Sequence, residues 1–384
     1  MNAVSAGRSP IPVILLAGFL GAGKTTLLNH LLREVGSVGA IDARIGVLVN
    51  DFGAVNVDAL LVAGQADGTV SLANGCMCCS VDRDGLDAAL AKLLAPAARI
   101  DAIVIEASGI AEPRSLIRMI TGSSDPRMRY GGLVYVVDAA MFARMRREHP
   151  AIDGHVEIAD LLVLNKIDLI NSAELDAIGS VLGALNPTAA RVAVVDARID
   201  PAVLFDPAPA PADDDDRPRQ LTLDALLAET TSARPEPPDP ASEVHVGDDP
   251  AEGRSHGACH GTAGHRHLHD DFVSVEFVSA SPMDPRRLAA FLERPPTGCY
   301  RIKGVVHFDV PGHRQRHIVH GVGGFVEVRS EPWAGRPRET NIVAIGAGMD
   351  CDKALAALRA AVADASSVDD EHGILHITRH LPNR

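Results

Sequence analysis

The chain has 384 residues and carries 36 lysines and arginines against 50 aspartates and glutamates, a formal net charge of −14 at pH 7. So acidic a balance argues against nonspecific nucleic-acid binding, which needs a basic surface, and 3% aromatic residues leave few rings on which bases could stack. The length fits two or three domains, and a 46% hydrophobic content can fill their cores. Six cysteines, three of them within four residues, do not form the pattern of a secreted disulfide framework.

The apolar run over residues 11–20 is too short to cross a bilayer, and it leads directly into a glycine-rich turn. It therefore predicts a buried strand. Since no pattern typical of a signal peptide precedes it, we expect a cytoplasmic protein with no membrane partner.

From residue 11 to about 205, short apolar strands alternate with helical stretches. This alternation predicts an α/β domain whose mainly parallel, doubly wound sheet has helices on both faces. The expected strands are 11–16, 45–49, 102–106, 133–138, 161–165 and 192–195, and the expected helices are 25–34, 84–94, 113–120 and 172–185.

Residues 206–250 differ in composition from the rest of the chain. They hold 9 of the 25 prolines and, with 12 acids and 3 bases, carry −9 of the net charge. Such a stretch buries too little apolar surface to offset its ordering entropy, so it predicts a linker with at most one short helix at 221–228. Six histidines and Cys259 follow within residues 245–269. They indicate either a segment that collects metal ions or a polar linker that binds them loosely.

A second periodic region begins at residue 272. Strands are expected at 272–278, 300–310, 316–328 and 341–345, with helices at 283–292 and 353–362, which together predict a smaller α+β domain. Cys299 and Cys351 lie at the start of two of these elements and are expected in the core. The predicted organisation is thus a P-loop domain at 10–205, a linker at 206–271 and a C-terminal domain at 272–384.

Residues 18–26 fit the phosphate-loop pattern, with four residues between two glycines followed by lysine and a hydroxyl residue. The pattern directly follows a strand and opens a helix, as this function requires. Backbone N–H groups of such a loop converge on phosphate oxygens, while Lys24 reaches the β- and γ-phosphates and the Thr25 hydroxyl binds Mg²⁺. The nucleotide-binding residues predicted here are Gly18, Gly21, Ala22, Gly23, Lys24, Thr25 and Thr26.

Two further segments complete the nucleotide site. Asn165-Lys166-Ile167-Asp168 follows a strand and resembles the guanine-specificity motif of GTPases, in which a carboxylate accepts two N–H bonds from the base. Glu106 ends the strand at 102–106, where a second Mg²⁺ ligand belongs, and the Gly- and Pro-containing residues 108–113 after it predict a flexible switch.

Asn74-Gly75-Cys76-Met77-Cys78-Cys79 places three thiols in four residues. Three thiolates suit one soft or borderline cation such as Zn²⁺, with Co²⁺ an alternative, and they leave a fourth position open for transfer. Buried unreactive cysteines or a strained Cys78–Cys79 disulfide are the structural alternatives.

In combination, these motifs resemble the CobW family of metallochaperone GTPases, which have a GTPase domain, a linker often rich in histidine and a CobW C-terminal domain. The resemblance implies a metal site at Cys76, Cys78 and Cys79 between two nucleotide-sensing switches. It also implies a switch aspartate at Asp58 that binds Mg²⁺ or positions water. Asp51 stands where the family usually carries Glu, which weakens the case for a direct metal role there.

From the sequence we therefore expect a GTPase that uses GTP and Mg²⁺ and delivers a transition metal, most readily zinc, to a client metalloprotein. Cobalt or iron delivery for cobalamin synthesis or nitrile hydratase, a metal buffer or sensor with little turnover, and a kinase with the same loop are the alternatives. A homo-oligomer remains open, and no nucleic-acid partner is expected.

Overall fold

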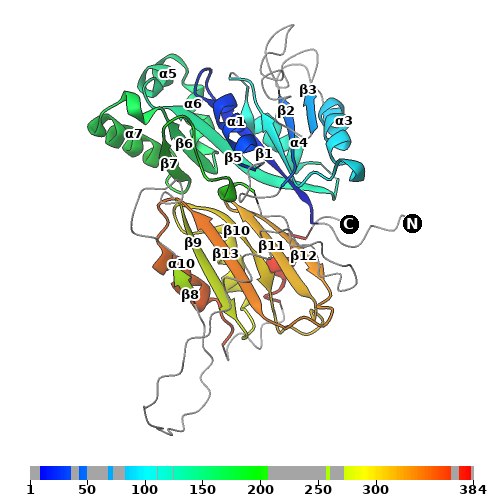
Figure 1. The fold of residues 1–384 in the computed structure, drawn as a ribbon. Coiled ribbons are helices and arrows are strands. Elements are labelled where there is room, and N and C mark those ends of the chain that lie inside the picture. Colours follow the sequence, from blue (N-terminus) through cyan, green and yellow to red (C-terminus); the bar gives the residue numbers. More distant parts are fainter. Residues whose placement is uncertain are drawn as a thin grey trace, which may run out of the picture. The chain divides into compact units, whose positions relative to one another are not determined.

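A computed structural model describes residues 9–35, 43–49, 68–71, 83–109, 111–123, 125–205, 257–259, 272–364 and 372–381. Within these residues the strands form a seven-stranded and a six-stranded sheet, both in one compact unit (Figure 1). The predicted parallel α/β domain and smaller α+β C-terminal domain are confirmed. The predicted linker at 206–250, its short helix at 221–228 and the cysteine motif at 76–79 lie outside the described residues.

The larger sheet is parallel throughout and has the strand order β3-β2-β4-β1-β5-β6-β7. The carboxyl ends of its strands therefore meet at one edge, where parallel α/β sheets bind ligands. Every residue of β1, β4 and β6 is buried, as their unbroken apolar sequence predicts. The bounds are β1 (Ile11–Gly18), β2 (Ile45–Val49), β3 (Gly68–Ser71), β4 (Ala102–Glu106), β5 (Met128–Asp138), β6 (Leu161–Asn165) and β7 (Ala190–Val194).

Helices cover both faces of this sheet. On one face, α1 (Lys24–Val35) packs Leu27, Leu28 and Leu31 onto the strands, together with the short 3-10 turn at Pro201–Val203. The opposite face is covered by the remaining helices of this domain, namely α3 (Arg83–Leu93), α4 (Pro113–Thr121), α5 (Phe142–Glu148), α6 (Ala151–Glu157) and α7 (Ser172–Leu185). Two more 3-10 turns lie at Pro96–Ala98 and Ile167–Leu169.

Three features of this domain were not predicted. Strand β3 has only four residues, and α5 and α6 have seven each, so these elements are too short to show a clear apolar periodicity. The two helices are supported by the ion pairs Arg144–Glu148 and Arg146–Asp153. Strand β5 begins at Met128 rather than at the predicted residue 133. Its first part contains two glycines at a shift in pairing with β1, which interrupts the apolar pattern.

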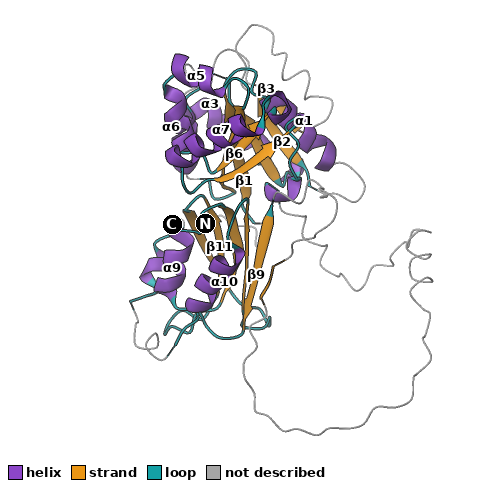
Figure 2. Cartoon of the chain, turned by 90° about the vertical axis from the view of Figure 1, so that its left-hand side faces the viewer, coloured by secondary structure: helices purple, strands orange, loops and turns teal. Residues whose placement is uncertain are grey.

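The smaller sheet is antiparallel, with the order β12-β11-β10-β13-β9-β8. Helices α9 (Pro285–Glu293) and α10 (Cys351–Ala360) lie on the same side of it (Figure 2), and α11 (Leu375–Thr378) contributes Ile377 to the same core. The strands are β8 (Gly257–Cys259), β9 (Val273–Ser279), β10 (Cys299–Val306), β11 (Arg316–Val322), β12 (Phe325–Glu331) and β13 (Thr340–Gly346).

The prediction of one strand over 316–328 is wrong, because this stretch is a hairpin. Gly323 and Gly324 have φ of 55° and 89°, and two successive residues with positive φ form the tight turn that matches strand twist. Strand β8 lies within the stretch predicted as a linker and pairs with β9. Cys299 is buried as predicted, and burial raises its pKa to about 12, whereas Cys351 begins α10 and is half-buried.

The two sheets share a packed boundary at the amino ends of β5 and β6. The Tyr300 hydroxyl donates to the Gly131 carbonyl at 3.2 Å. Beside it, the Asp160 carboxylate accepts hydrogen bonds from the Tyr130 hydroxyl at 2.7 Å and the Leu133 amide at 2.8 Å. Removal of this carboxylate from water raises its pKa to about 6, despite these two bonds, which favour the ionised form.

The β11–β12 turn provides a test of this boundary. A Cβ added at Gly323 would overlap the Asp160 carboxylate, whereas one added at Gly312, which has φ of 81°, meets nothing within 4 Å. Both substitutions strain a left-handed backbone, so only Gly323→Ala adds a steric clash. We expect Gly323→Ala to lower the free energy of unfolding by about 1–3 kcal/mol more than Gly312→Ala, measured by denaturant titration. Equal losses in the two variants would contradict this packing.

Candidate nucleotide site

The phosphate loop connects β1 to α1 and depends on two close approaches. A Cβ on Gly18, whose φ is 146°, would overlap the Val136 carbonyl oxygen of β5. A Cβ on Gly23, whose φ is 107°, would overlap the side-chain amide of Asn165. Glycine is therefore required at both positions, and the loop lies directly against the ends of β5 and β6.

Lys24 and Thr25 open α1 and lie at the base of the loop. The Lys24 ammonium, in a side chain that is almost fully buried, donates to the carbonyls of Gly18 at 3.0 Å and Phe19 at 3.3 Å. The Thr25 hydroxyl donates to Glu106 Oε1 at 2.7 Å. Glu106 is the last residue of β4 and is only 3% exposed, and β4 pairs with β1 so that Leu16 lies opposite it.

This pair of oxygen donors suits Mg²⁺, a hard cation that prefers carboxylate and hydroxyl ligands. Thr25 and Glu106, each predicted to serve Mg²⁺ binding, are in direct contact between α1 and β4. Thr26, in the same first turn of α1, is exposed.

The predicted guanine motif reaches the same loop from the end of β6. The Asn165 side-chain amide donates to the Ala22 carbonyl at 2.9 Å, and its oxygen accepts from the Ala197 amide at 2.8 Å. Lys166, which has a φ of 64°, donates to the Gly21 carbonyl at 2.8 Å. Asp168 follows on an exposed 3-10 turn, where its carboxylate is accessible to a base.

Two residues of this site were missed in the sequence. Asp138 ends β5 opposite Asn165, and its Oδ2 lies 2.7 Å from Lys166 Nζ while Oδ1 accepts from the Met141 amide at 3.1 Å. Asp138 could have been predicted from the sequence, because it is an acid at the end of a buried strand, as Glu106 is. Ala197 acts through its backbone amide and a φ of 54°, for which an alanine side chain gives no signal.

The predicted switch leaves the sheet after Glu106. The Ala107 amide donates to the Leu16 carbonyl at 2.9 Å. Next, Gly109 packs against the phosphate loop so closely that a Cβ there would lie 2.7 Å from the Leu20 nitrogen. The switch and the loop are therefore in direct contact.

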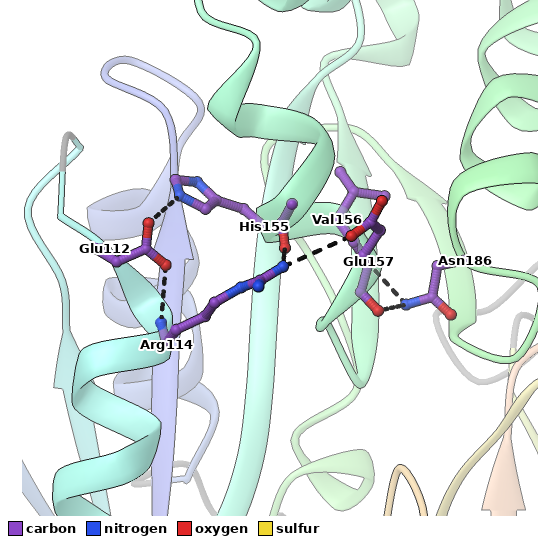
Figure 3. Close-up of polar contacts among 7 residues, drawn as sticks. Glu112, Arg114, His155, Val156, Glu157 and Asn186 are labelled. Carbon is purple, nitrogen blue, oxygen red and sulfur yellow. Dashed lines mark hydrogen bonds and ion pairs between the residues drawn. The ribbon is translucent and has the colours of Figure 1, made fainter.

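The far end of the switch is attached to α6, which is in turn attached to α7. Glu112 caps α4 by accepting from the Arg114 amide at 3.2 Å, and its second oxygen lies 3.3 Å from His155 Nε2 (Figure 3). Arg114 in turn donates to the Gly154 carbonyl at 3.1 Å. The side chain of Asn186, at the end of α7, donates to the carbonyl of Val156 on α6 at 2.9 Å, so the three helices form one connected support (Figure 3).

The remaining predicted residues, Asp58, Cys76, Cys78 and Cys79, lie outside the described residues, and their roles stay predictions. In the part of the chain that the structure describes, no three His, Cys, Asp or Glu residues are grouped to hold a metal ion. Nor does any helix of that part have the length and apolar character needed to cross a membrane.

Known protein families match both domains of the chain. Residues 12–193 match the family described as CobW/HypB/UreG, nucleotide-binding domain, and residues 272–362 match the family described as Cobalamin synthesis protein cobW C-terminal domain. The protein named zinc chaperone CobW from Sinorhizobium sp is 30% identical over 398 residues, which cover 94% of this chain and 99% of that relative.

Other relatives align over part of their length. The protein named zinc chaperone YjiA from Escherichia coli (strain K12) is 37% identical over 172 residues, covering 43% of this chain and 52% of the relative. The Schizosaccharomyces pombe protein named zinc-regulated GTPase metalloprotein activator 1 is 34% identical over 201 residues, covering 50% of this chain and 47% of the relative. A crystal structure of Zn(II)-bound YjiA GTPase from E. coli aligns with 93% of this chain and all of that chain, at 21% identity and a TM-score of 0.40.

The loop, the buried acid and the Asn-Lys-x-Asp motif, on a parallel sheet, define a P-loop GTPase. More narrowly, the chain belongs to the CobW/HypB/UreG family and carries the CobW C-terminal domain, which confirms the resemblance inferred from its motifs.

Asp138 provides a specific test of the guanine side of the site. Asp138→Ala removes the carboxylate that holds Lys166, and loss of a charged hydrogen bond of this kind costs about 1.5–3 kcal/mol. Lys166 contacts the phosphate loop and not the group that attacks the γ-phosphate. The lost free energy should therefore weaken GTP binding rather than slow the chemical step. Steady-state kinetics should show a KM for GTP raised about tenfold or more with kcat within about twofold.

A matched control is Asp153→Ala, which removes a carboxylate of α6 that is paired with Arg146 of α5. It should leave both constants unchanged. A fall in kcat with unchanged KM in Asp138→Ala would show that Asp138 acts in the chemical step instead.

Proposed function

We propose that this protein is a GTP-hydrolysing metallochaperone that binds zinc through Cys76, Cys78 and Cys79 and transfers it to a client metalloprotein in the cytoplasm. The observation that carries the proposal is the contact between Thr25 and buried Glu106 at the start of the switch. Such a contact joins the nucleotide site to a segment that can change with nucleotide state. The names of the relatives, zinc chaperones and a zinc-regulated GTPase, support zinc as the cargo.

Hydrolysis in this site is mainly a matter of position and charge. The loop amides and Lys24 bind the phosphates, while Thr25 and Glu106 would hold Mg²⁺, which neutralises charge on the β- and γ-phosphates. Asp58 is the candidate for positioning the attacking water, and Asp168 selects guanine.

The register of the sheet supports a link between the nucleotide site and the chain that leads to the cysteines. Val49, at the end of β2, lies in register with Glu106 on one side and with Ser71 of β3 on the other. Neighbouring strands are about 4.8 Å apart, so Ser71 lies about 10 Å from Glu106. In the proposed function, a change at Glu106 on loss of the γ-phosphate is transmitted across β2 to β3, the strand that precedes the cysteines in the sequence.

A metal buffer or sensor with little turnover is the main alternative, and it differs in one measurable property, the rate of GTP hydrolysis. Delivery of cobalt or iron, including to cobalamin synthesis or nitrile hydratase, differs in the metal that the cysteines prefer. A homo-oligomer is compatible with either function.

Two variants separate the nucleotide and metal parts of the proposal. Lys24→Ala should reduce kcat/KM for GTP at least about 100-fold, because it removes the charge that reaches the β- and γ-phosphates, and should leave GDP-state zinc affinity unchanged. Cys78→Ser should weaken zinc binding at least about tenfold, measured by competition with a chromophoric chelator, and should retain basal turnover. Cys351→Ser, a half-buried cysteine in α10, is the control and should change neither.

The coupling itself is tested by measuring zinc affinity with GDP and with a non-hydrolysable GTP analogue. We expect about a 5- to 150-fold difference, the usual range of coupling between two sites. Identical affinities would exclude coupling, and tighter cobalt than zinc binding at matched conditions would overturn the cargo assignment.

A further inference from the structure

Several buried side-chain nitrogens of the C-terminal domain have no hydrogen-bond partner. In the residues that the structure describes, they include His307 Nδ1, His313 Nδ1, Arg316 Nε, Trp333 Nε1 and both ring nitrogens of His317. Buried polar groups are almost always hydrogen-bonded, and exceptions commonly reflect a water or an ion. Leaving such a group unpaired costs about 1–3 kcal/mol, so a ligand that satisfied the imidazoles would be stabilising.

Two of these imidazoles are neighbours. His317 lies on β11 with its side chain in the helix-covered core, fully buried beside Val319 and 5.1 Å from the Phe308 ring. His313 belongs to the turn before β11 and is half-buried, and its ring centroid lies 6.3 Å from that of His317, with the planes tilted by 32°.

The environment keeps the inner imidazole neutral. Burial lowers the pKa of His317 to about 4. The neighbouring His313 also lowers this pKa, and the main chain of Gln315 raises it by a smaller amount. A neutral imidazole has a free lone pair, which is the form that binds metal.

We propose that His313 and His317 together bind one zinc-like transition-metal cation, at a site in the C-terminal domain that is separate from the cysteine motif. With Zn–N bonds of about 2.0–2.1 Å, two imidazoles at tetrahedral positions of one ion place their ring centroids roughly 5 Å apart. The observed separation of 6.3 Å is larger than this value. Binding therefore requires the half-buried His313 side chain to rotate toward His317.

The number of ligands defines what such a site can do. No third His, Cys, Asp or Glu joins the pair within the described residues, so two tetrahedral positions remain for water or for a ligand from another molecule. Structural zinc sites are closed by four protein ligands, whereas an open site exchanges its metal. The half-exposed His313 provides the side from which the ion enters.

The test uses the full chain with Cys76, Cys78 and Cys79 replaced by Ser, so that the result does not depend on the proposed function of the cysteine motif. Zn²⁺ is titrated against a chromophoric chelator in this background and in the same background with His313→Ala. We expect the His313→Ala protein to bind one equivalent fewer with measurable affinity. Histidines of the linker are common to both proteins and cancel in the difference.

His320→Ala is the matched control, because His320 lies three residues further along β11 and projects from the opposite face of the sheet. The His320→Ala protein should bind zinc with the same stoichiometry and affinity as the background protein. His317→Gln should reproduce the loss seen in His313→Ala, and if burial prevents that variant from folding, the half-exposed His313 variant decides the question. Unchanged zinc stoichiometry and affinity in His313→Ala would overturn the site and would imply that water satisfies these imidazoles.

Discussion

The whole nucleotide site depends on the absence of a side chain at Gly23. This absence lets the Asn165 amide lie against the phosphate loop, where it bonds the Ala22 carbonyl and the Ala197 backbone at once. One side chain thereby joins three loops that are distant in sequence, those after β1, β6 and β7. Phosphate recognition and base recognition are consequently one rigid structure rather than two.

The strands that carry this structure are fixed at both ends. Strands β5 and β6 begin beside the Tyr130–Asp160 hydrogen bond, where the second sheet packs, and they end at Asp138 and Asn165 in the guanine site. Packed strands of this kind resist deformation because protein interiors are as dense as organic crystals. Conformational change is therefore expected in the segments that leave the carboxyl edge, such as the switch after Glu106.

The sequence predicted those parts of the structure that local chemistry determines. A loop that must contact phosphate needs glycines and a lysine, and strands buried on both faces need unbroken apolar runs, so Gly18–Thr26 and the strands up to Glu106 and Asn165 were recognisable. The contact between Thr25 and Glu106 was not predicted as such, but it agrees with the assignment of both residues to Mg²⁺, because one begins a helix and the other ends a strand at the same edge of a parallel sheet.

The misses arose where tertiary packing outweighs local pattern. Short helices such as α5 and α6 are held by ion pairs and by burial of a few residues, including Phe142 and Ile152, so their sequences have little periodicity. The hairpin at Gly323–Gly324 was hidden because the apolar alternation continues through the turn. The His313–His317 pair depends on a turn that folds back onto β11, which spacing alone does not specify.

Magnitudes constrain how a GTPase of this design can release zinc. Coupling between two sites in a protein is typically about 1–3 kcal/mol, whereas a structural zinc site contributes about 10–16 kcal/mol. Loss of the γ-phosphate can therefore weaken a thiolate site but cannot by itself expel the ion into water. Release must proceed by ligand exchange, in which an incoming client ligand replaces one thiolate at a time while the ion stays coordinated. The proposed site of Cys76, Cys78 and Cys79, with one open position, would meet this requirement, because the open position would accept the first client ligand before any thiolate leaves. In this scheme GTP hydrolysis sets the time at which exchange becomes favourable, and the ligands of the client supply most of the driving force.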